Sequence, residues 1–447
     1  MPRHAGRGQA LSKLSTACLT DKPRRVRSAS LLQASTDHVH RQLAVAAAAR
    51  PPVHTAATRV NILLMVRALG FGGTERQLVY LAQGLAQRGH RVSVATFYTH
   101  GAFADVFAGG NPEWLVAAKR SRWDVVGFCW RLMRLLAGRR PDVVYSFLPV
   151  PNLLAALFRA AFCGRAALVW GVRGTPLDMT RYDWLERASI RLERWASHLP
   201  DMVIANSRCG AAWARGPEFQ AARVATIVNG IDTHWFRPPA AGERAAARAD
   251  LGCPPATLVV AVVARLDPMK DHPTFLKALA IAAQTVPHII GLIVGDGPPP
   301  VVARLRAKTA ALGIADRVIW AAARRQVREV YHAADILCLP SAFGEGFPNV
   351  VGEAMACGLS CIVTAVGDAA ELVGETGRVV PPRDPCELAR AILDLAKPIR
   401  ESQPCNFAAR RRIVENFELS AMISTTESSL LRVVAERSRR EPGGAVC

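Results

Sequence analysis

The hydrophobic pattern of the chain becomes regular from residue 59 onward. Residues 59–66, RVNILLMV, form a mostly apolar run that is typical of a parallel strand buried on both faces. A glycine-rich loop follows at 67–75, and RQLVYLAQGLAQRG (76–89) then places apolar residues at helical spacing and ends at a glycine. The next apolar run, at 91–98, completes a strand–helix–strand unit.

Similar apolar runs recur in two groups, with helical stretches between them. The first group continues at 142–148, 167–172, 201–207 and 224–230. The second comprises 257–266, 289–297, 316–322, 334–341, 360–367 and 377–382. Alternating strands and helices predict parallel, doubly wound sheets. The fold class is therefore α/β, with two Rossmann-like domains in tandem.

The same pattern sets the expected domain boundaries. Residues 1–58 are rich in Arg, Ala and Ser and lack sustained periodicity, which predicts a disordered basic extension. A transit peptide or an extension from a misassigned start would have the same composition. The two domains are expected at 59–235 and 236–417, with a helix at 418–436 that packs back on the first domain. Residues 437–447 are expected to be a disordered tail.

Composition narrows the class of protein. Of the 447 residues, 50% are hydrophobic and 21% are charged, as in globular proteins. The 11 cysteines form no CxxC pair, which argues against a zinc ribbon and suits a reducing compartment. The first residues lack the apolar region of a signal peptide. We therefore expect a cytoplasmic protein.

The net charge of +20 favours anionic partners, namely nucleic acid, phosphorylated ligands or an anionic membrane surface. Nucleic acid is not expected, because the basic extension has no aromatic residues on which bases could stack.

Two segments at the predicted strand ends suit a phosphate group. GFGG (70–73) follows a strand and opens a helix, where glycines allow close backbone approach and the helix offers unpaired N–H groups. In VARLDPMKDH (263–272), Arg265 and Lys270 flank a turn after another strand. Two such cations could clamp a diphosphate, or could be solvated surface charges.

The most informative segment is SAFGEGFPNVVGEAMACG (341–358). It follows a predicted strand, and Pro348 suits the first position of a short helix. Glu345 then precedes the helix and Glu353 lies about one turn inside it. A carboxylate can accept two hydroxyl hydrogens, which suits a vicinal diol. The alternative is a capping glutamate followed by a solvated one.

These segments together resemble the retaining nucleotide-sugar glycosyltransferases of family four, which have the GT-B fold. The resemblance rests on EGFPNVVGE followed by AMACG, and on GFGGTE, VIANS, IVNGID, VARLDPMKDH, LIVGDGP and VGDAAELVGETGRVVPPRDP, in family order over about residues 60–420. It implies two domains facing each other across a cleft. It also implies transfer of a hexose-type sugar from a UDP- or GDP-sugar, with retention at the anomeric carbon, to a glycan or lipid-linked acceptor in cell-surface polysaccharide synthesis.

The resemblance also implies residue roles. Arg265 and Lys270 would bind the donor diphosphate, approached from the first domain by Gly72 and Gly73. Glu345 would act as the catalytic residue on the reactive face of the donor sugar, and Glu353 would bind the ribose. The backbone around the intervening residues would hold sugar and phosphate: Gly346, Phe347, Pro348 and Asn349. No metal or other cofactor is implied, because cations and helix dipoles neutralise the leaving group.

The chain departs from the family pattern in its first domain. Many relatives carry a catalytic histidine in a loop there, whereas YSFLP (145–149) ends a strand without one. His100 is the nearest candidate for this role.

Residues 119–140 suggest a membrane contact. They combine large apolar side chains with arginines: Trp123, Trp130, Leu132, Leu135 and Leu136, with Arg120, Arg122, Arg131, Arg134, Arg139 and Arg140. This fits a basic amphipathic helix on the inner face of the plasma membrane, or an ordinary helix with a solvated basic face.

Two other functions fit the same architecture. A nucleotide-sugar epimerase or hydrolase would turn over the donor without an acceptor. A sugar-nucleotide-binding protein that has lost catalysis would bind the donor without turnover.

Overall fold

The computed structural model describes residues 59–70, 72–99, 101, 103–107, 109–121, 123–159, 165–174, 183–217, 219–400 and 405–440. These residues belong to one compact unit, Val53–Cys447. The predicted disordered segment 1–58 and the candidate His100 lie outside the described residues.

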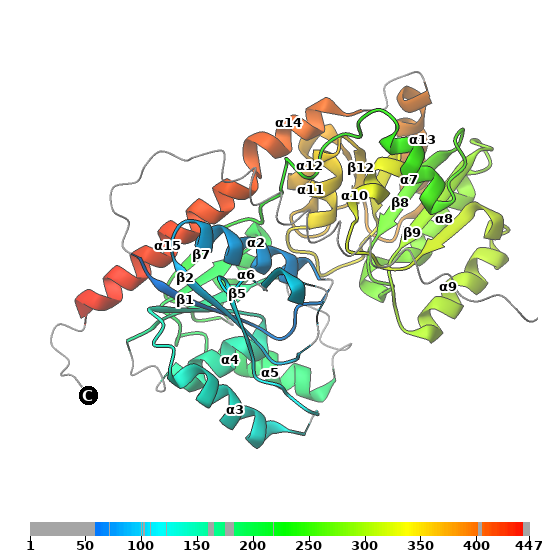
Figure 1. Ribbon diagram of the computed structural model, residues 1–447. Helices are drawn as coiled ribbons and strands as arrows, with labels where there is room; N and C mark the ends of the chain where they lie inside the picture. Colours follow the sequence, from blue (N-terminus) through cyan, green and yellow to red (C-terminus); the bar gives the residue numbers. More distant parts are fainter. Residues whose placement is uncertain are drawn as a thin grey trace, which may run out of the picture. The chain divides into compact units, whose positions relative to one another are not determined.

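The first part of this unit is built on a parallel sheet of seven strands in the order β3-β2-β1-β4-β5-β6-β7 (Figure 1). Its strands are β1 (Asn61–Val66), β2 (Arg91–Thr96), β3 (Glu113–Val116), β4 (Val143–Phe147), β5 (Ala167–Val172), β6 (Met202–Ala205) and β7 (Val224–Thr226). The sequence analysis missed β3, because this edge strand has only four residues and a half-buried pattern.

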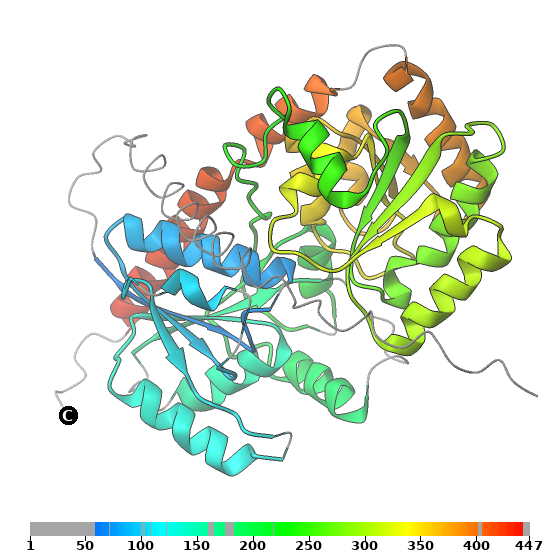
Figure 2. The same cartoon turned by 45° about the vertical axis from the view of Figure 1, so that its right-hand side comes forward.

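Helices cover both faces of the first sheet. They are α2 (Gly73–Gln87), α3 (Val125–Ala137), α4 (Pro149–Leu157), α5 (Trp184–Trp195) and α6 (Arg208–Ala214), with the short helix η1 (Ala104–Phe107). Side chains alternate along β1: Ile62 and Leu64 pack with α2, whereas Leu63 and Met65 pack with α3 and α4. Figure 2 shows helices on both sides of this sheet. This alternation explains the continuous apolar run in the sequence, because both faces are buried.

The second part is built on a parallel sheet of six strands in the order β10-β9-β8-β11-β12-β13. Its strands are β8 (Leu258–Val263), β9 (Ile289–Val294), β10 (Val318–Ala321), β11 (Ile336–Leu339), β12 (Ser360–Thr364) and β13 (Arg378–Val380). Its helices are α7 (Glu243–Leu251), η4 (Pro268–Lys270), α8 (His272–Ala282), α9 (Pro299–Ala311), η5 (Ala315–Arg317), α10 (Arg328–Ala333), α11 (Asn349–Ala356), α12 (Ala369–Val373), η6 (Gly374–Thr376), α13 (Pro385–Arg400) and α14 (Phe407–Asn416).

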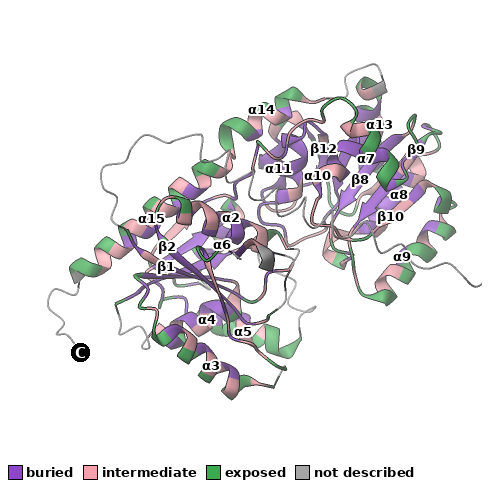
Figure 3. Cartoon of the chain, in the orientation of Figure 1, coloured by how far each residue is buried: buried purple, intermediate pink, exposed green. Residues whose placement is uncertain are grey.

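Both sheets are buried, and the exposed surface lies on the outer sides of the helices (Figure 3). The strand orders are those of doubly wound sheets, in which β1 and β8 each have a neighbour on either side reached by crossovers. The predicted α/β fold class with two Rossmann-like sheets is confirmed.

The C-terminal helix α15 (Leu419–Arg440) returns to the first sheet. Ile423, Leu430 and Val433 belong to the core that α2 also covers. The segment just before this helix lies beside the earlier segment around Ile231, because the Ile231 amide donates a hydrogen bond to the Phe417 carbonyl oxygen at 2.8 Å. The helix extends to Arg440, so the tail expected from residue 437 is helical in its first residues. Residues 441–447 lie outside the described part.

Candidate active site

Glu345 and Lys270 are in direct contact. Glu345 lies in the loop between β11 and α11 and is only 6% exposed. Lys270 Nζ and Ser341 Oγ both donate to its Oε1, each at 2.5 Å. Lys270 ends η4, and the Ala342 amide ties the loop to it by donating to the Met269 carbonyl at 2.8 Å. Two residues that the sequence analysis placed at the donor sugar and its diphosphate are thus brought together.

Arg265, the second predicted phosphate-binding cation, is exposed just after β8. It makes no ion pair with any described residue. Its charge reaches Glu75 in the first turn of α2: burial raises the pKa of Glu75, and Arg265 acts in the opposite direction. A phosphate would also be favoured at the N-terminus of α2, which begins after Gly72.

The glycine loop contacts the second sheet at the start of α2. Gly72 is the N-cap residue, and helix α2 begins at Gly73. Asn349 Nδ2 donates to the Gly73 carbonyl at 3.2 Å, and a Cβ at Gly73 would lie only 2.7 Å from that nitrogen. Glycine at this position therefore permits the close approach.

The remaining residues of the EGFPN segment are held by many contacts. Asn349 Oδ1 accepts a hydrogen bond from Asn229 Nδ2 at 2.8 Å. Pro348 is the N-cap residue of α11, and the ring of Phe347 packs in the core against Phe417. The Gly346 carbonyl accepts from the Asp368 amide at 3.1 Å. The backbone of this segment is therefore fixed, as a preorganised binding loop requires.

Glu353 has partners on both of its oxygens and is 2% exposed. Arg76 of α2 donates to Oε1 at 2.7 Å, and the Tyr331 hydroxyl of α10 donates to Oε2 at 2.7 Å. Burial lowers the pKa of Arg76, whereas Glu353 and the nearby Tyr80 raise it. The net result is a raised pKa for Arg76. Glu353 is neither solvated nor open, so binding a ribose would require an exchange of these partners.

The sequence analysis missed Arg173, which follows β5 directly. Its guanidinium donates to Tyr145 Oη at 2.7 Å and to Asn229 Oδ1 at 3.2 Å, and lies over the ring of Phe147 at 4.5 Å. Through Asn229 it is linked to Asn349. The available signal was a single arginine at the carboxyl end of the apolar run ALVWGV. The predicted candidate for a first-domain catalytic group, His100, is not described.

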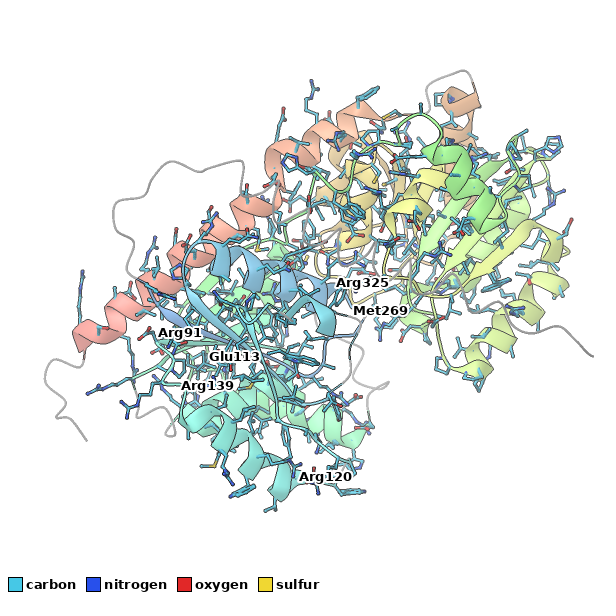
Figure 4. The ribbon with its side chains drawn as sticks, in the orientation of Figure 1. Arg91, Glu113, Arg120, Arg139, Met269 and Arg325 are labelled. Atoms are coloured by element: carbon cyan, nitrogen blue, oxygen red, sulfur yellow. The ribbon has the colours of Figure 1, made fainter. Side chains whose placement is uncertain are left out.

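The helix predicted within residues 119–140 is α3 (Val125–Ala137), and part of its predicted apolar face is buried. Leu132 and Leu136 are buried in the core, and Leu135 packs against it. Arg131 is paired with Asp124, and Arg139 with Glu113 at 2.6 Å. Figure 4 shows Arg139 and Glu113 at one edge of the first sheet, with Arg120 near the start of α3. Three of the five predicted apolar side chains, Leu132, Leu135 and Leu136, therefore belong to the core or pack against it.

Large apolar side chains, the predicted Trp123 and Trp130 among them, are exposed at α3 and on α5. Trp123 is 75% exposed and Trp195 is 72% exposed. The exposed large apolar side chains here are Trp123, Val125, Val126, Trp130 and Met133 at α3, and Trp184, Leu185, Leu192 and Trp195 on α5. We call these side chains the α3/α5 surface. In the described part of the chain no helix has the length and apolar character to cross a bilayer.

Two solved structures illustrate proteins with a similar architecture. Anabaena Alr3699/HepE, solved in complex with UDP-glucose, is similar with a TM-score of 0.72 and 22% identity, over 83% of this chain and 100% of that chain. Sucrose-phosphate synthase from Thermosynechococcus elongatus is similar with a TM-score of 0.72 and 22% identity, over 85% and 100% of the two chains. The fold is thus the GT-B fold.

Sequence comparison gives the family. The model of Glycosyltransferase Family 4 matches residues 71–235, and that of Glycosyl transferases group 1 matches residues 257–397. These two matches cover most of both sheets. The chain belongs to the group 1 glycosyltransferases of family 4.

Two curated relatives have the same name. D-inositol 3-phosphate glycosyltransferase of Segniliparus rotundus is 34% identical over 176 residues, which span 37% of this chain and 37% of that protein. The protein of the same name from Streptomyces scabiei is 28% identical over 367 residues, 73% of this chain and 78% of that protein. The chain thus spans little more than a third of the length of the first of these relatives.

Within the described ranges, no group of three or more His, Cys, Asp or Glu side chains is placed to hold a metal. The groups available to a ligand are two cations, buried carboxylates and backbone donors at helix starts.

Proposed function

We propose that the protein transfers a hexose-type sugar from a UDP- or GDP-sugar to a glycan or lipid-linked acceptor, with retention at the anomeric carbon. The observation that carries this proposal is the buried contact of Lys270 with Glu345. This contact supports the proposed pairing of a cation for the leaving diphosphate with a carboxylate for the sugar. Similar structures hold UDP and glucose or UDP-glucose, which supports the donor class.

Lys270 and Glu345 would change partners during the reaction. In the structure the carboxylate neutralises the lysine. A donor phosphate competes for Lys270, because an ammonium group on a flexible stem can move between anions. Glu345 Oε1 is then released to accept a sugar hydroxyl hydrogen, while Ser341 still orients it.

The departing nucleoside diphosphate would be stabilised by protein groups alone. Lys270, exposed Arg265 and the N-terminus of α2 all favour negative charge. With the acceptor attacking from the side on which the leaving group departs, the configuration of the sugar is retained. No divalent metal is required, so a chelator should leave the rate unchanged.

The acceptor is proposed to be presented at a membrane. The α3/α5 surface combines exposed tryptophans with basic side chains, such as Arg134 over the ring of Trp130 at 4.9 Å. Aromatic rings and arginines together suit the headgroup region of an anionic bilayer. This supports peripheral attachment to the inner face of the plasma membrane and a role in cell-surface polysaccharide synthesis. The names of the relatives support an inositol phosphate as a second acceptor candidate.

Donor binding tests the proposal. Titration calorimetry with UDP-glucose, UDP-galactose, UDP-N-acetylglucosamine, GDP-mannose and GDP-fucose should give one clear binder. Arg265→Gln should weaken that binding about tenfold, since a charge-assisted phosphate contact is removed. The matched control is Arg304→Gln, which changes an exposed arginine on α9. Absence of binding by all five donors would contradict the proposal.

A further inference from the structure

Two polar side chains at the carboxyl edge of the first sheet have unused hydrogen-bonding atoms. Arg173 follows β5 and Asn206 follows β6. Because Val172 and Ala205 are partners in the parallel register, these two residues occupy adjacent positions. Arg173 Nε and Asn206 Oδ1 are both buried and have no hydrogen-bond partner among the described residues. Buried polar atoms without partners are rare and costly, so a neighbouring donor and acceptor in this state point to a ligand.

The positive charge of Arg173 is also unmatched. All of its partners are neutral: the Tyr145 hydroxyl, the Asn229 amide oxygen and the Phe147 ring. No carboxylate of the described residues forms an ion pair with it. The more deeply buried Arg248, by contrast, pairs with Asp335 at 2.7 Å. A half-buried charge without a counter-ion is unfavourable, and an anion would relieve it.

Asn206 lies beside the loop that carries Glu345, and Arg173 is linked to the end of that segment through Asn229 and Asn349. A Cβ at Gly346 would be 3.2 Å from Asn206 Oδ1 and 3.5 Å from the Cα of Gly174. Gly174 and Gly346 therefore approach each other closely, because neither residue has a side chain. Asn206 is 4% exposed, so a small separation at these glycines is needed to open the place to a ligand. That place adjoins the proposed donor sugar on the side of the first sheet, where the acceptor must approach.

We propose that Arg173 and Asn206 form the acceptor subsite, and that the acceptor is a sugar or polyol bearing a phosphate or carboxylate. Arg173 Nε donates to the anionic group, and Asn206 Oδ1 accepts a hydroxyl hydrogen. The inference rests on the proposed transferase function, since it names the acceptor class for the same site. The donor diphosphate is the other source of a phosphate near this guanidinium, and the experiment separates the two.

The test is titration calorimetry on the full chain with UDP present. The probes are glucose 6-phosphate, inositol 3-phosphate and glucuronate, each compared with neutral glucose or inositol. Wild type should bind the anionic probes at least about tenfold more tightly than the neutral ones. Arg173→Met should abolish this preference while leaving the Kd for UDP within about twofold, a loss confined to the anion contact. Arg173→Lys should restore part of it, and Arg304→Gln should change nothing.

Thermal stability provides the check on folding. Arg173→Met removes an unpaired, half-buried charge and retains an apolar chain over Phe147, so its Tm should not fall by more than a few degrees. Equal binding of anionic and neutral probes by wild type would overturn the inference, as would unchanged anion binding in Arg173→Met. Loss of UDP binding in Arg173→Met would assign the guanidinium to the donor and also overturn it. If wild type bound neither UDP nor GDP, the proposed function itself would fall.

Discussion

Arg76 and Glu353 are 277 residues apart in the chain and are joined by an ion pair of 2.7 Å. Arg76 belongs to the helix after the glycine loop, and Glu353 belongs to the helix after the EGFPN segment. Tyr331 completes the cluster by donating to the second oxygen of Glu353. The glycine loop and the EGFPN segment are thus tied through the helices that follow them.

Removing the charge of Glu353 should weaken both stability and donor binding. Glu353→Gln leaves the mostly buried Arg76 without a counter-ion and should lower the free energy of unfolding by about 3 kcal/mol. Urea unfolding of Glu353→Gln measures this loss. If Glu353 also holds the donor ribose, donor affinity should fall about tenfold in the same variant.

The double variant Arg76→Met/Glu353→Gln separates these two effects. It removes both charges, so stability should return toward that of wild type while donor affinity stays low. Recovery of donor affinity in the double variant would show that Glu353 acts only as the partner of Arg76.

Lys270→Met should weaken donor binding about a hundredfold, because it removes the cation proposed for the leaving phosphate. Ser341→Ala removes the other partner of Glu345 Oε1 and should leave the Kd for UDP nearly unchanged. Calorimetric titration with UDP compares the two variants. Equal losses in both would mean that the shape of the Glu345 loop, rather than the charge of Lys270, determines phosphate binding.

The stability of the protein should depend on pH through Glu193. This side chain of α5 is buried, it accepts from Asn152 Nδ2 at 2.6 Å, and burial raises its pKa from 4.5 to about 7. The folded state therefore binds this proton more tightly than the unfolded state. Stability from this group is present below about pH 4.5 and is lost as the pH rises to about 7.

Glu193→Gln should remove that dependence. Relative to wild type, the variant should gain roughly 3 kcal/mol between pH 4.5 and pH 8, and little below that window. Chemical unfolding of both proteins across this pH range gives the difference. A constant difference at all pH values would mean that Glu193 does not titrate there.

The α3/α5 surface predicts binding to anionic membranes. Trp130→Ser/Trp195→Ser should reduce binding to vesicles containing phosphatidylglycerol at least about tenfold, because two interfacial rings are lost. Both rings are exposed, so Tm should be unchanged. The matched control is Phe407→Ser, which removes a 71% exposed aromatic ring from α14. Vesicle sedimentation measures the binding, and an equal effect of the control would contradict a specific surface.

The sequence predicted those features that depend on local pattern. Strands buried on both faces appear as apolar runs, and Lys270 and Glu345 each follow such a run, so their meeting at one sheet edge could be expected. The Arg76–Glu353 pair could not, because it joins helices from different sheets. The role of Arg173 could not be predicted either, because a single arginine after a strand does not form a recognisable sequence pattern. On α3, helical spacing alone does not distinguish leucines in the core from tryptophans in solvent.

The central claim is tested most directly by turnover of the bound donor. The full chain would be incubated with that donor, with and without lipid extract, and released nucleoside diphosphate would be measured in wild type, Glu345→Ala and Arg304→Gln. The account predicts acceptor-dependent release in wild type and Arg304→Gln, a loss of at least about a thousandfold in Glu345→Ala, and no effect of a chelator. Release that needs no acceptor, or that persists in Glu345→Ala, would contradict it.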